Sequence, residues 1–366
     1  NFSINPIGGF GLHQGLLRYG ALLKTPEEKN SLFRFTFFKG IWATCILIFI
    51  ILIGSFFIDF KFENTKNYLA FLSITLIQMY MFELMKIQFR LQHKNKLFAL
   101  TEVVFFSILT LTILILSYYF KEKGYAIALV LTPILSVLFF VRKIKADLVF
   151  KEKLSIINRE FWKYGFFASL SNVATQLLFA IDILLIGLLL NDPEMVTNYK
   201  YVSLIPLSLL FLPRAFINTD FVVFTENIYQ KKYIVKYIKS YLLLFLLLSI
   251  GFCLFFGLFA DTILSLFDVT FIQYKTSFII LVFGVSGILI FRGLFGNLLS
   301  SIGKAHVNFY ITSMALLFNV VSNYYLISKY GIKGAAITSA LLMWATGIVS
   351  AFVFWKLYNN HFLNRK

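Results

Sequence analysis

Residues 240–260 read SYLLLFLLLSIGFCLFFGLFA, an apolar run of 21 residues without a charged side chain. A helix needs about 20 predominantly apolar residues to cross the hydrocarbon core of a bilayer. Nine further stretches of this kind occur in the chain, at residues 39–58, 68–87, 97–118, 125–141, 161–190, 199–224, 274–298, 306–327 and 334–357. A lipid-facing backbone must satisfy its own hydrogen bonds, so each stretch is predicted to be a helix. The sequence therefore predicts an all-α integral membrane protein with ten visible spans.

The composition excludes several other classes of protein. Of the 366 residues, 59% are hydrophobic and 14% charged, whereas a soluble domain has about 25% charged residues. The net charge of +17 does not indicate a nucleic-acid partner, because the basic residues are not clustered on a polar face. The two cysteines and four histidines form no metal-binding or catalytic motif, so no catalytic residue, metal or cofactor is predicted.

The basic residues instead indicate the orientation of the spans. Of the 34 Lys and Arg residues, 24 fall in alternate polar segments and only 8 in the segments between them. By the positive-inside rule the richer set is cytoplasmic, and this set includes the C-terminal tail. The segments on the other side are all short, which leaves no room there for an enzyme domain.

The chain also contains an internal repeat. Residues 123–128 read KGYAIA and residues 333–338 read KGAAIT, an offset of 210 residues. The same offset moves the span at 68–87 onto the one at 274–298. A repeat of this length predicts two bundles of six spans in the same orientation, an arrangement typical of transporters.

The offset predicts two bundles: an N-terminal bundle at 1–150 and a C-terminal six-helix bundle at 151–366. A polar cytoplasmic linker begins near residue 142. The first bundle lacks counterparts for one to two spans of the second, so we expect a twelve-span plan of which this chain carries about ten full spans.

Several short motifs resemble one transporter family. They are NVVSN at 319–323, YGIKGAAI at 330–337, DILLIG at 182–187 followed by Tyr199, and the segment 11–19 that ends in Leu-Leu-Arg-Tyr. They resemble bacterial polysaccharide (O-antigen type) flippases of the multidrug/oligosaccharidyl-lipid/polysaccharide exporter superfamily. The resemblance implies two six-helix bundles around a central cavity, in the bacterial inner membrane. It also implies ion-coupled or potential-driven alternating access that moves an undecaprenyl-pyrophosphate-linked oligosaccharide to the periplasmic leaflet, with a polysaccharide polymerase and a chain-length regulator as partners.

Ionisable residues inside spans are costly and are therefore candidate functional residues. Arg214 lies near the middle of its span, where a guanidinium could bind phosphate oxygens, and Asn218 shares its face. Pro206 and Pro213 flank this region and could kink or open the helix. The alternative is an arginine that pairs with a carboxylate only for packing.

Asp182 lies on the span at 161–190 with Ser171, Asn172, Thr175 and Gln176, which share a broad polar face. This face could line a cavity and contact sugars, and Asp182 is deep enough to couple transport to a proton or cation. The alternatives are hydrogen bonding between helices and an ion pair with an arginine.

For three other charged residues, a structural role is favoured over a functional one. Arg292 is a candidate for substrate binding, but its position near the inner end of a span favours snorkelling to the head groups. Glu83 is a candidate for ion coupling, but a pair with Lys86 one turn away is favoured. Arg18 could lie at the mouth of a cavity, and a positive-inside residue is the favoured interpretation.

Three other functions remain as alternatives to flipping of a lipid-linked oligosaccharide. A cation-coupled exporter of small amphipathic molecules would be favoured by a cavity rich in carboxylates with no basic residue. A polysaccharide polymerase or ligase would need a long exterior loop, which the short segments disfavour. A static scaffold fits poorly with a duplicated bundle that contains buried charges.

Overall fold

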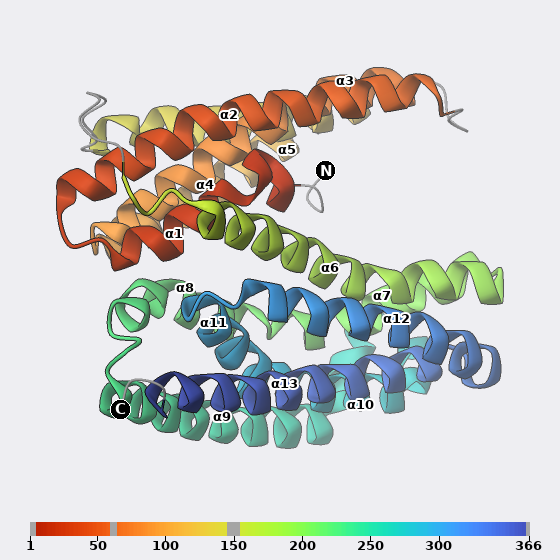
Figure 1. The fold of residues 1–366 in the computed structure, drawn as a ribbon. Helices are drawn as coiled ribbons and strands as arrows, with labels where there is room; N and C mark the ends of the chain where they lie inside the picture. The colour runs from red at the N-terminus through yellow and green to blue at the C-terminus, as the bar shows by residue number, and fades with distance from the viewer. Residues whose placement is uncertain (1–4, 59–63, 145–153, 364–366) are drawn as a thin grey trace. The chain divides into compact units, whose positions relative to one another are not determined.

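The computed structural model describes residues 5–58, 64–144 and 154–363, and all the regular secondary structure in these ranges is helical. In the first part the helices are η1 (Asn5–Gly11), α1 (Leu12–Leu22), α2 (Pro26–Phe56), α3 (Thr65–Ser73), α4 (Thr75–Leu91), α5 (Asn95–Phe140), η2 (Val141–Lys143) and α6 (Arg159–Leu190). They continue with α7 (Pro193–Ser208), α8 (Phe211–Glu226), α9 (Lys231–Ser265), η3 (Val269–Tyr274), α10 (Lys275–Gly287), η4 (Ile288–Arg292), α11 (Gly293–Ser301), α12 (Ala305–Tyr330) and α13 (Ile332–Leu363). The predicted all-α class is confirmed (Figure 1).

The chain packs into two compact units, Asn1–Val173 and Ala174–Lys366. The division lies within α6, whereas the sequence predicted a boundary at 150/151, which stays a prediction. The predicted linker from residue 142 lies partly outside the described residues, because 145–153 are not described.

Nine helical segments of the described chain are long and apolar enough to cross a membrane. The longest, 47 residues at Asn95–Val141, folds back on itself at Lys121, where the backbone leaves the helical region. The hydroxyl oxygens of Thr112 and Thr132 lie 3.1 Å apart across this hairpin. The nine segments thus contain the ten predicted spans, with 97–118 and 125–141 as the two arms of α5.

The predicted repeat is visible in the backbone of this hairpin. Lys121 has φ 50° and ψ −125°, and Gly331, 210 residues later, has φ 57° and ψ −141° between α12 and α13. An L-residue with a side chain adopts this conformation only with strain. The two halves therefore make the same turn, although only the second has glycine there.

The glycine that follows each turn is required by a close approach. A Cβ atom on Gly124 would lie 1.8 Å from the carbonyl oxygen of Leu116, and one on Gly334 would lie 2.0 Å from that of Leu326. All these positions are again 210 residues apart. The glycine of the two KG dipeptides thus has one physical cause, a helix hairpin that leaves no room for a Cβ atom at this position.

Small residues also bring α13 close to α10 (Figure 1) and to η4 in the second unit. A Cβ atom on Gly287 would lie 2.8 Å from the Cα of Trp344, and one on Gly347 would lie 2.9 Å from the carbonyl oxygen of Gly287. Because lipid provides little hydrophobic drive for helix association, such close contact supplies the packing energy. This contact fixes η4, a single π-helical turn that ends at Arg292.

Large apolar side chains cover the outside of both units, as a bilayer requires. On α9, Leu247, Leu254 and Leu258 are exposed, whereas Phe245 and Ala260 are buried. Apolar surface of this extent indicates contact with lipid rather than with water.

The hairpin glycine gives a first prediction. Gly331→Ala should lower the free energy of unfolding by about 1–3 kcal/mol, because alanine is strained at this positive φ. Gly251→Ala is the matched control, since its Cβ would meet nothing within 4 Å and alanine favours a helix interior. Thermal unfolding in detergent measures both. A Gly331→Ala protein as stable as the Gly251→Ala protein would contradict the assignment of this turn.

Candidate functional site

The centre of the second unit is a buried carboxylate. Asp182, on α6, is only 3% exposed. Its Oδ1 accepts hydrogen bonds from the side-chain amides of Asn319, at 3.0 Å, and Asn323, at 2.7 Å, both on α12. Its Oδ2 accepts from the Tyr199 hydroxyl of α7, at 3.1 Å, and from the Ser339 hydroxyl of α13. We call these five residues the Asp182 cluster.

Every donor to Asp182 in the described chain is an uncharged group. A carboxylate can accept about four hydrogen bonds, so this one is fully satisfied without an ion pair. The alternative prediction, an ion pair between Asp182 and an arginine, is therefore not observed among the described residues. The alternative of hydrogen bonds between helices is present, since the cluster joins α6, α7, α12 and α13. A coupling role for Asp182 stays a prediction.

The sequence holds a further signal for this cluster. Asn308, Thr312, Asn319 and Asn323 fall within an arc of about 60° at the helical repeat of 3.6 residues. Asn319, Asn323 and Tyr199 appear in the sequence analysis only as parts of motifs that resemble a transporter family. The polar stripe is a separate signal for Asn319 and Asn323. A polar stripe along an apolar span indicates buried polar contacts, and here all four residues of the stripe are at most 5% exposed.

Arg292 is the second polar centre of this unit. Its Nη1 donates to Oδ1 of Asn308, at 3.1 Å, and to Oγ of Ser350, at 2.6 Å, and its Nη2 donates to Oγ1 of Thr312, at 2.8 Å. We call these four residues the Arg292 cluster. The favoured interpretation of Arg292 as a snorkelling residue is wrong, because the guanidinium turns toward α12 and α13 rather than outward to head groups. The signal for this pocket was the same polar stripe.

A small cavity lies between the two clusters. Its volume open to the centre of a water molecule is about 40 Å³, which is enough for a few waters. Its polar lining consists of Thr175, Arg292, Thr312, Asn319, Ser339 and Thr346. Asn319 and Ser339 belong to the Asp182 cluster, and Thr312 belongs to the Arg292 cluster. The cavity thus has hydrogen-bonding groups on both sides and a cation at one of them.

Arg214 and Asn218 lie on α8, away from the lining of this cavity. Arg214 is exposed and Asn218 partly buried. Neither makes a hydrogen bond or ion pair with another described residue. The expected effect of Pro206 and Pro213 is visible, since α7 ends at Ser208 and α8 begins at Phe211.

The predicted polar face of α6 is only partly used. Thr175 lines the cavity and Asp182 forms its cluster. Asn172 is exposed and Gln176 partly buried, and neither has a hydrogen-bond partner in the described chain. Ser171 is buried.

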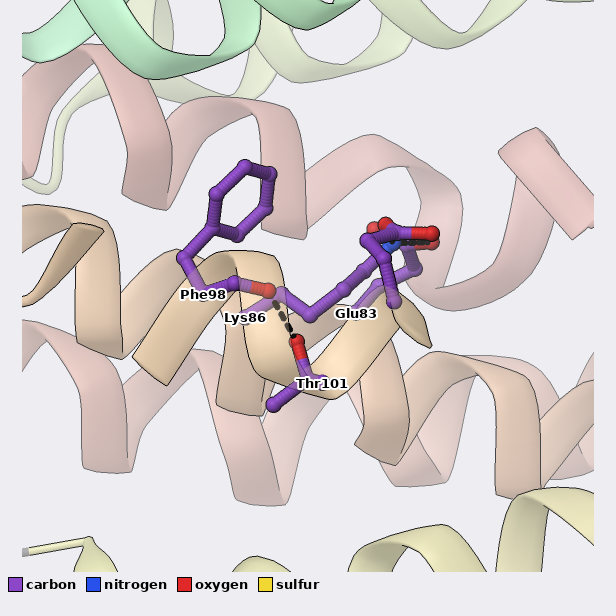
Figure 2. Close-up of polar contacts among 5 residues, drawn as sticks. Glu83, Lys86, Phe98 and Thr101 are labelled. Atoms are coloured by element: carbon purple, nitrogen blue, oxygen red, sulfur yellow. Dashed lines mark hydrogen bonds and ion pairs between the residues drawn. The ribbon is translucent and has the colours of Figure 1, made fainter. Parts of the chain in front are cut away.

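Two predicted residues belong to the first unit. Arg18 is buried, and its guanidinium carbon lies 4.5 Å from the ring centre of Tyr19 and 5.2 Å from that of Tyr164. Glu83 makes the expected pair with Lys86 at 2.7 Å, as Figure 2 shows. Lys86 also binds Glu102 at 2.7 Å. This small ion-pair group lies beside the aromatic ring of Phe82.

Solved structures show which known fold the chain shares. It matches a mutant form of the MATE transporter VcmN of Vibrio cholerae with a TM-score of 0.76 and 15% identity, over 98% of this chain and 87% of the other. It matches a MATE structure in complex with MaD5 with a TM-score of 0.74 and 16% identity, over 98% and 86%. A third match is an outward-facing multidrug resistance MATE family transporter of the MOP superfamily, with a TM-score of 0.69 and 15% identity, over 98% and 85%. The chain therefore has the fold of MATE transporters.

No protein-family profile matches the chain, and no curated protein matches it. The resemblance to flippases within the same superfamily stays a prediction.

The Asp182 cluster gives a second prediction. Asn323→Leu should lower the free energy of unfolding by about 1–3 kcal/mol, because a buried carboxylate then loses a donor. Ser328→Ala on the same helix is the control, since the Ser328 hydroxyl is exposed and bonds only its own helix backbone. Equal midpoints of thermal unfolding for the two variants would rule out a charged, fully bonded Asp182.

Proposed function

We propose that this protein is an alternating-access transporter that exports small amphipathic molecules across a bacterial inner membrane, driven by a proton or cation gradient. We further propose that its C-terminus is cytoplasmic, as the distribution of basic residues predicts. The observation that carries the proposal is Asp182, a carboxylate buried within a helical bundle and bonded only to neutral donors of the described chain. The MATE fold supports the transport class, since one of the matched structures is a multidrug resistance transporter.

The partners of Asp182 suggest where a proton would bind. The amide nitrogens on Oδ1 can only donate, whereas the hydroxyls of Tyr199 and Ser339 on Oδ2 can donate or accept. A proton on Oδ2 can therefore be accommodated when one hydroxyl rotates and accepts it. A proton on Oδ1 would leave two amide donors facing an O–H group. We infer that Oδ2 is the site that exchanges protons.

Such an exchange would alter the contacts among three helices. When Oδ2 carries a proton, the hydrogen bonds that join α6 to α7 and α13 change in direction and strength. A ligand shifts a conformational equilibrium only through its different affinity for the two states. Proton binding at Asp182 would supply that difference, since the donors are arranged for the charged form in the described conformation.

Flipping of a lipid-linked oligosaccharide is the second candidate. It is favoured by the residues that carry the resemblance, because Asn319, Asn323 and Tyr199 are all partners of Asp182. The argument from Arg214 is weaker than the sequence suggested, since this residue does not line the cavity of its unit. The proposed oligosaccharide substrate and its partner proteins therefore rest on the resemblance alone.

A third prediction tests the coupling role of Asp182. Asp182→Asn keeps the size of the side chain and one acceptor oxygen but removes the exchangeable charge, and its amide nitrogen can donate to a hydroxyl that has rotated. In the complete protein reconstituted into vesicles, it should abolish transport driven by a pH or cation gradient, measured as flux of a fluorescent amphipathic dye. Asp220→Asn is the matched control, because Asp220 likewise accepts a tyrosine hydroxyl, that of Tyr237 at 2.9 Å. Gradient-dependent flux that survives Asp182→Asn would limit this residue to a structural role.

A fourth prediction separates the two candidate functions. In the native host, a flippase that binds pyrophosphate through Arg214 would make less surface glycan upon Arg214→Ala and would accumulate lipid-linked oligosaccharide. For the proposed exporter we expect neither effect, whereas dye efflux should remain. Accumulation of the lipid-linked oligosaccharide would favour the flippase over the exporter.

A further inference from the structure

The Arg292 cluster has features that the transport proposal does not use. An arginine side chain has five N–H donors, and three of those of Arg292 are taken by Asn308, Ser350 and Thr312. The other two have no partner among the residues that the structure describes. Arg292 also lines the cavity, so its side chain borders space that a small ligand group could fill.

The guanidinium also lacks a counter-charge. Its three partners are neutral oxygens, and no carboxylate of the described chain forms an ion pair with it. A charge inside a membrane-spanning bundle is expensive unless it is paired. Asp182 approaches the cavity only through its partners Asn319 and Ser339, and its own four donors already saturate it.

The repeat shows that the fold itself does not need this cluster. The positions 210 residues before Arg292, Asn308 and Ser350 are Phe82, Phe98 and Phe140. These three phenylalanines are buried and belong to a single apolar cluster in the first unit. At these three positions the same helical plan is thus closed by aromatic packing, and the buried guanidinium of this unit, that of Arg90, lies 5.4 Å from the ring centre of Phe98.

The fourth counterpart makes the difference between the halves clearer. The position equivalent to Thr312 is Glu102, which pairs with Lys86 rather than with an arginine. The first unit therefore neutralises the Lys86 cation with its own carboxylates, as Figure 2 shows for Glu83 and Lys86. The second unit leaves its cation without an acid among the described residues, which indicates that a ligand provides the negative charge.

We propose that the Arg292 cluster binds the carboxylate group of an anionic ligand. A planar carboxylate matches two N–H donors of a guanidinium and forms short, charge-assisted bonds with them. The cavity has about 40 Å³ open to the centre of a water molecule, which is room for a small polar group such as a single carboxylate. The hydroxyls of Thr346 and Thr312 on the same lining provide further polar contacts.

This inference rests on the proposed function, because it identifies the bound carboxylate as part of the transported molecule and makes carboxylate-bearing amphipathic molecules the substrate class. Binding, however, can be measured without a gradient and without flux. A failure to bind carboxylate would leave gradient-driven dye export through Asp182 untouched, and a failure of export would leave the binding site intact.

The test is thermal unfolding of the purified complete protein in detergent at constant pH, with sodium acetate added against sodium chloride of equal ionic strength. We expect acetate to raise the unfolding midpoint of the unsubstituted protein in a saturable way. Arg292→Met should lose this rise, and Arg292→Lys should need at least about tenfold more acetate, because it keeps the charge but not the two parallel donors. Lys304→Met, which removes an exposed cation at the turn before α12, should respond like the unsubstituted protein.

The midpoints of thermal unfolding without acetate show whether each variant is folded. Arg292→Met should still unfold cooperatively, at a midpoint only modestly below that of the unsubstituted protein, because Oδ1 of Asn308 loses a donor but no charge is left without a partner. Its former partners also keep other bonds, such as those of Thr312 and Ser350 to backbone carbonyls of their own helices. The proposal would be overturned if acetate had no effect, had the same effect on Arg292→Met, or had the same effect as chloride. It would also be overturned if phosphate had a larger effect than acetate and this effect depended on Arg292.

Discussion

A carboxylate inside a membrane-spanning bundle must be met by donors from the protein, because no water is available from the hydrocarbon core. In this molecule the constraint falls on Asp182, and four helices are organised around it. Two amides of α12 bind one oxygen and hydroxyls of α7 and α13 bind the other. The position of α12 and α13 relative to α6 is therefore fixed by polar contacts as well as by packing. Any function that depends on movement within this unit must loosen or redirect those bonds.

The two halves share a backbone plan but differ in chemistry. The hairpin turns at Lys121 and Gly331 have nearly the same φ and ψ, and the glycines that follow meet equivalent carbonyls. Polar positions of the second half nevertheless correspond to phenylalanines in the first. A duplicated scaffold can keep its helix contacts while the two copies place different buried polar groups at equivalent positions. This asymmetry concentrates the described polar cavity in the second unit.

Much of the fold could be predicted from the sequence, because membrane spans are defined by local composition. The apolar runs predicted ten spans, and the KG motifs predicted the repeat whose turns the backbone reproduces. The pair of Glu83 and Lys86 was also predictable, since one helical turn separates the two residues. The inward direction of the Arg292 side chain was not predicted, because depth along a span says nothing about which way a long side chain turns. Asp182 was recognised as unusual, but its donors come from residues up to 157 positions away.

The sequence by itself determined the class of structure, the number of spans, the duplication and the rarity of charges inside the bilayer. These properties follow from the length and polarity of continuous segments and from an offset that can be counted. Only the tertiary structure decided that Asp182 has four neutral donors, that Arg292 lies inward beside Asn308 and Ser350, and that a small cavity separates the two clusters. The physical reason is that a polar side chain in an apolar span must find its partners on other helices. Which helices supply them depends on packing across the bundle, which no local pattern records.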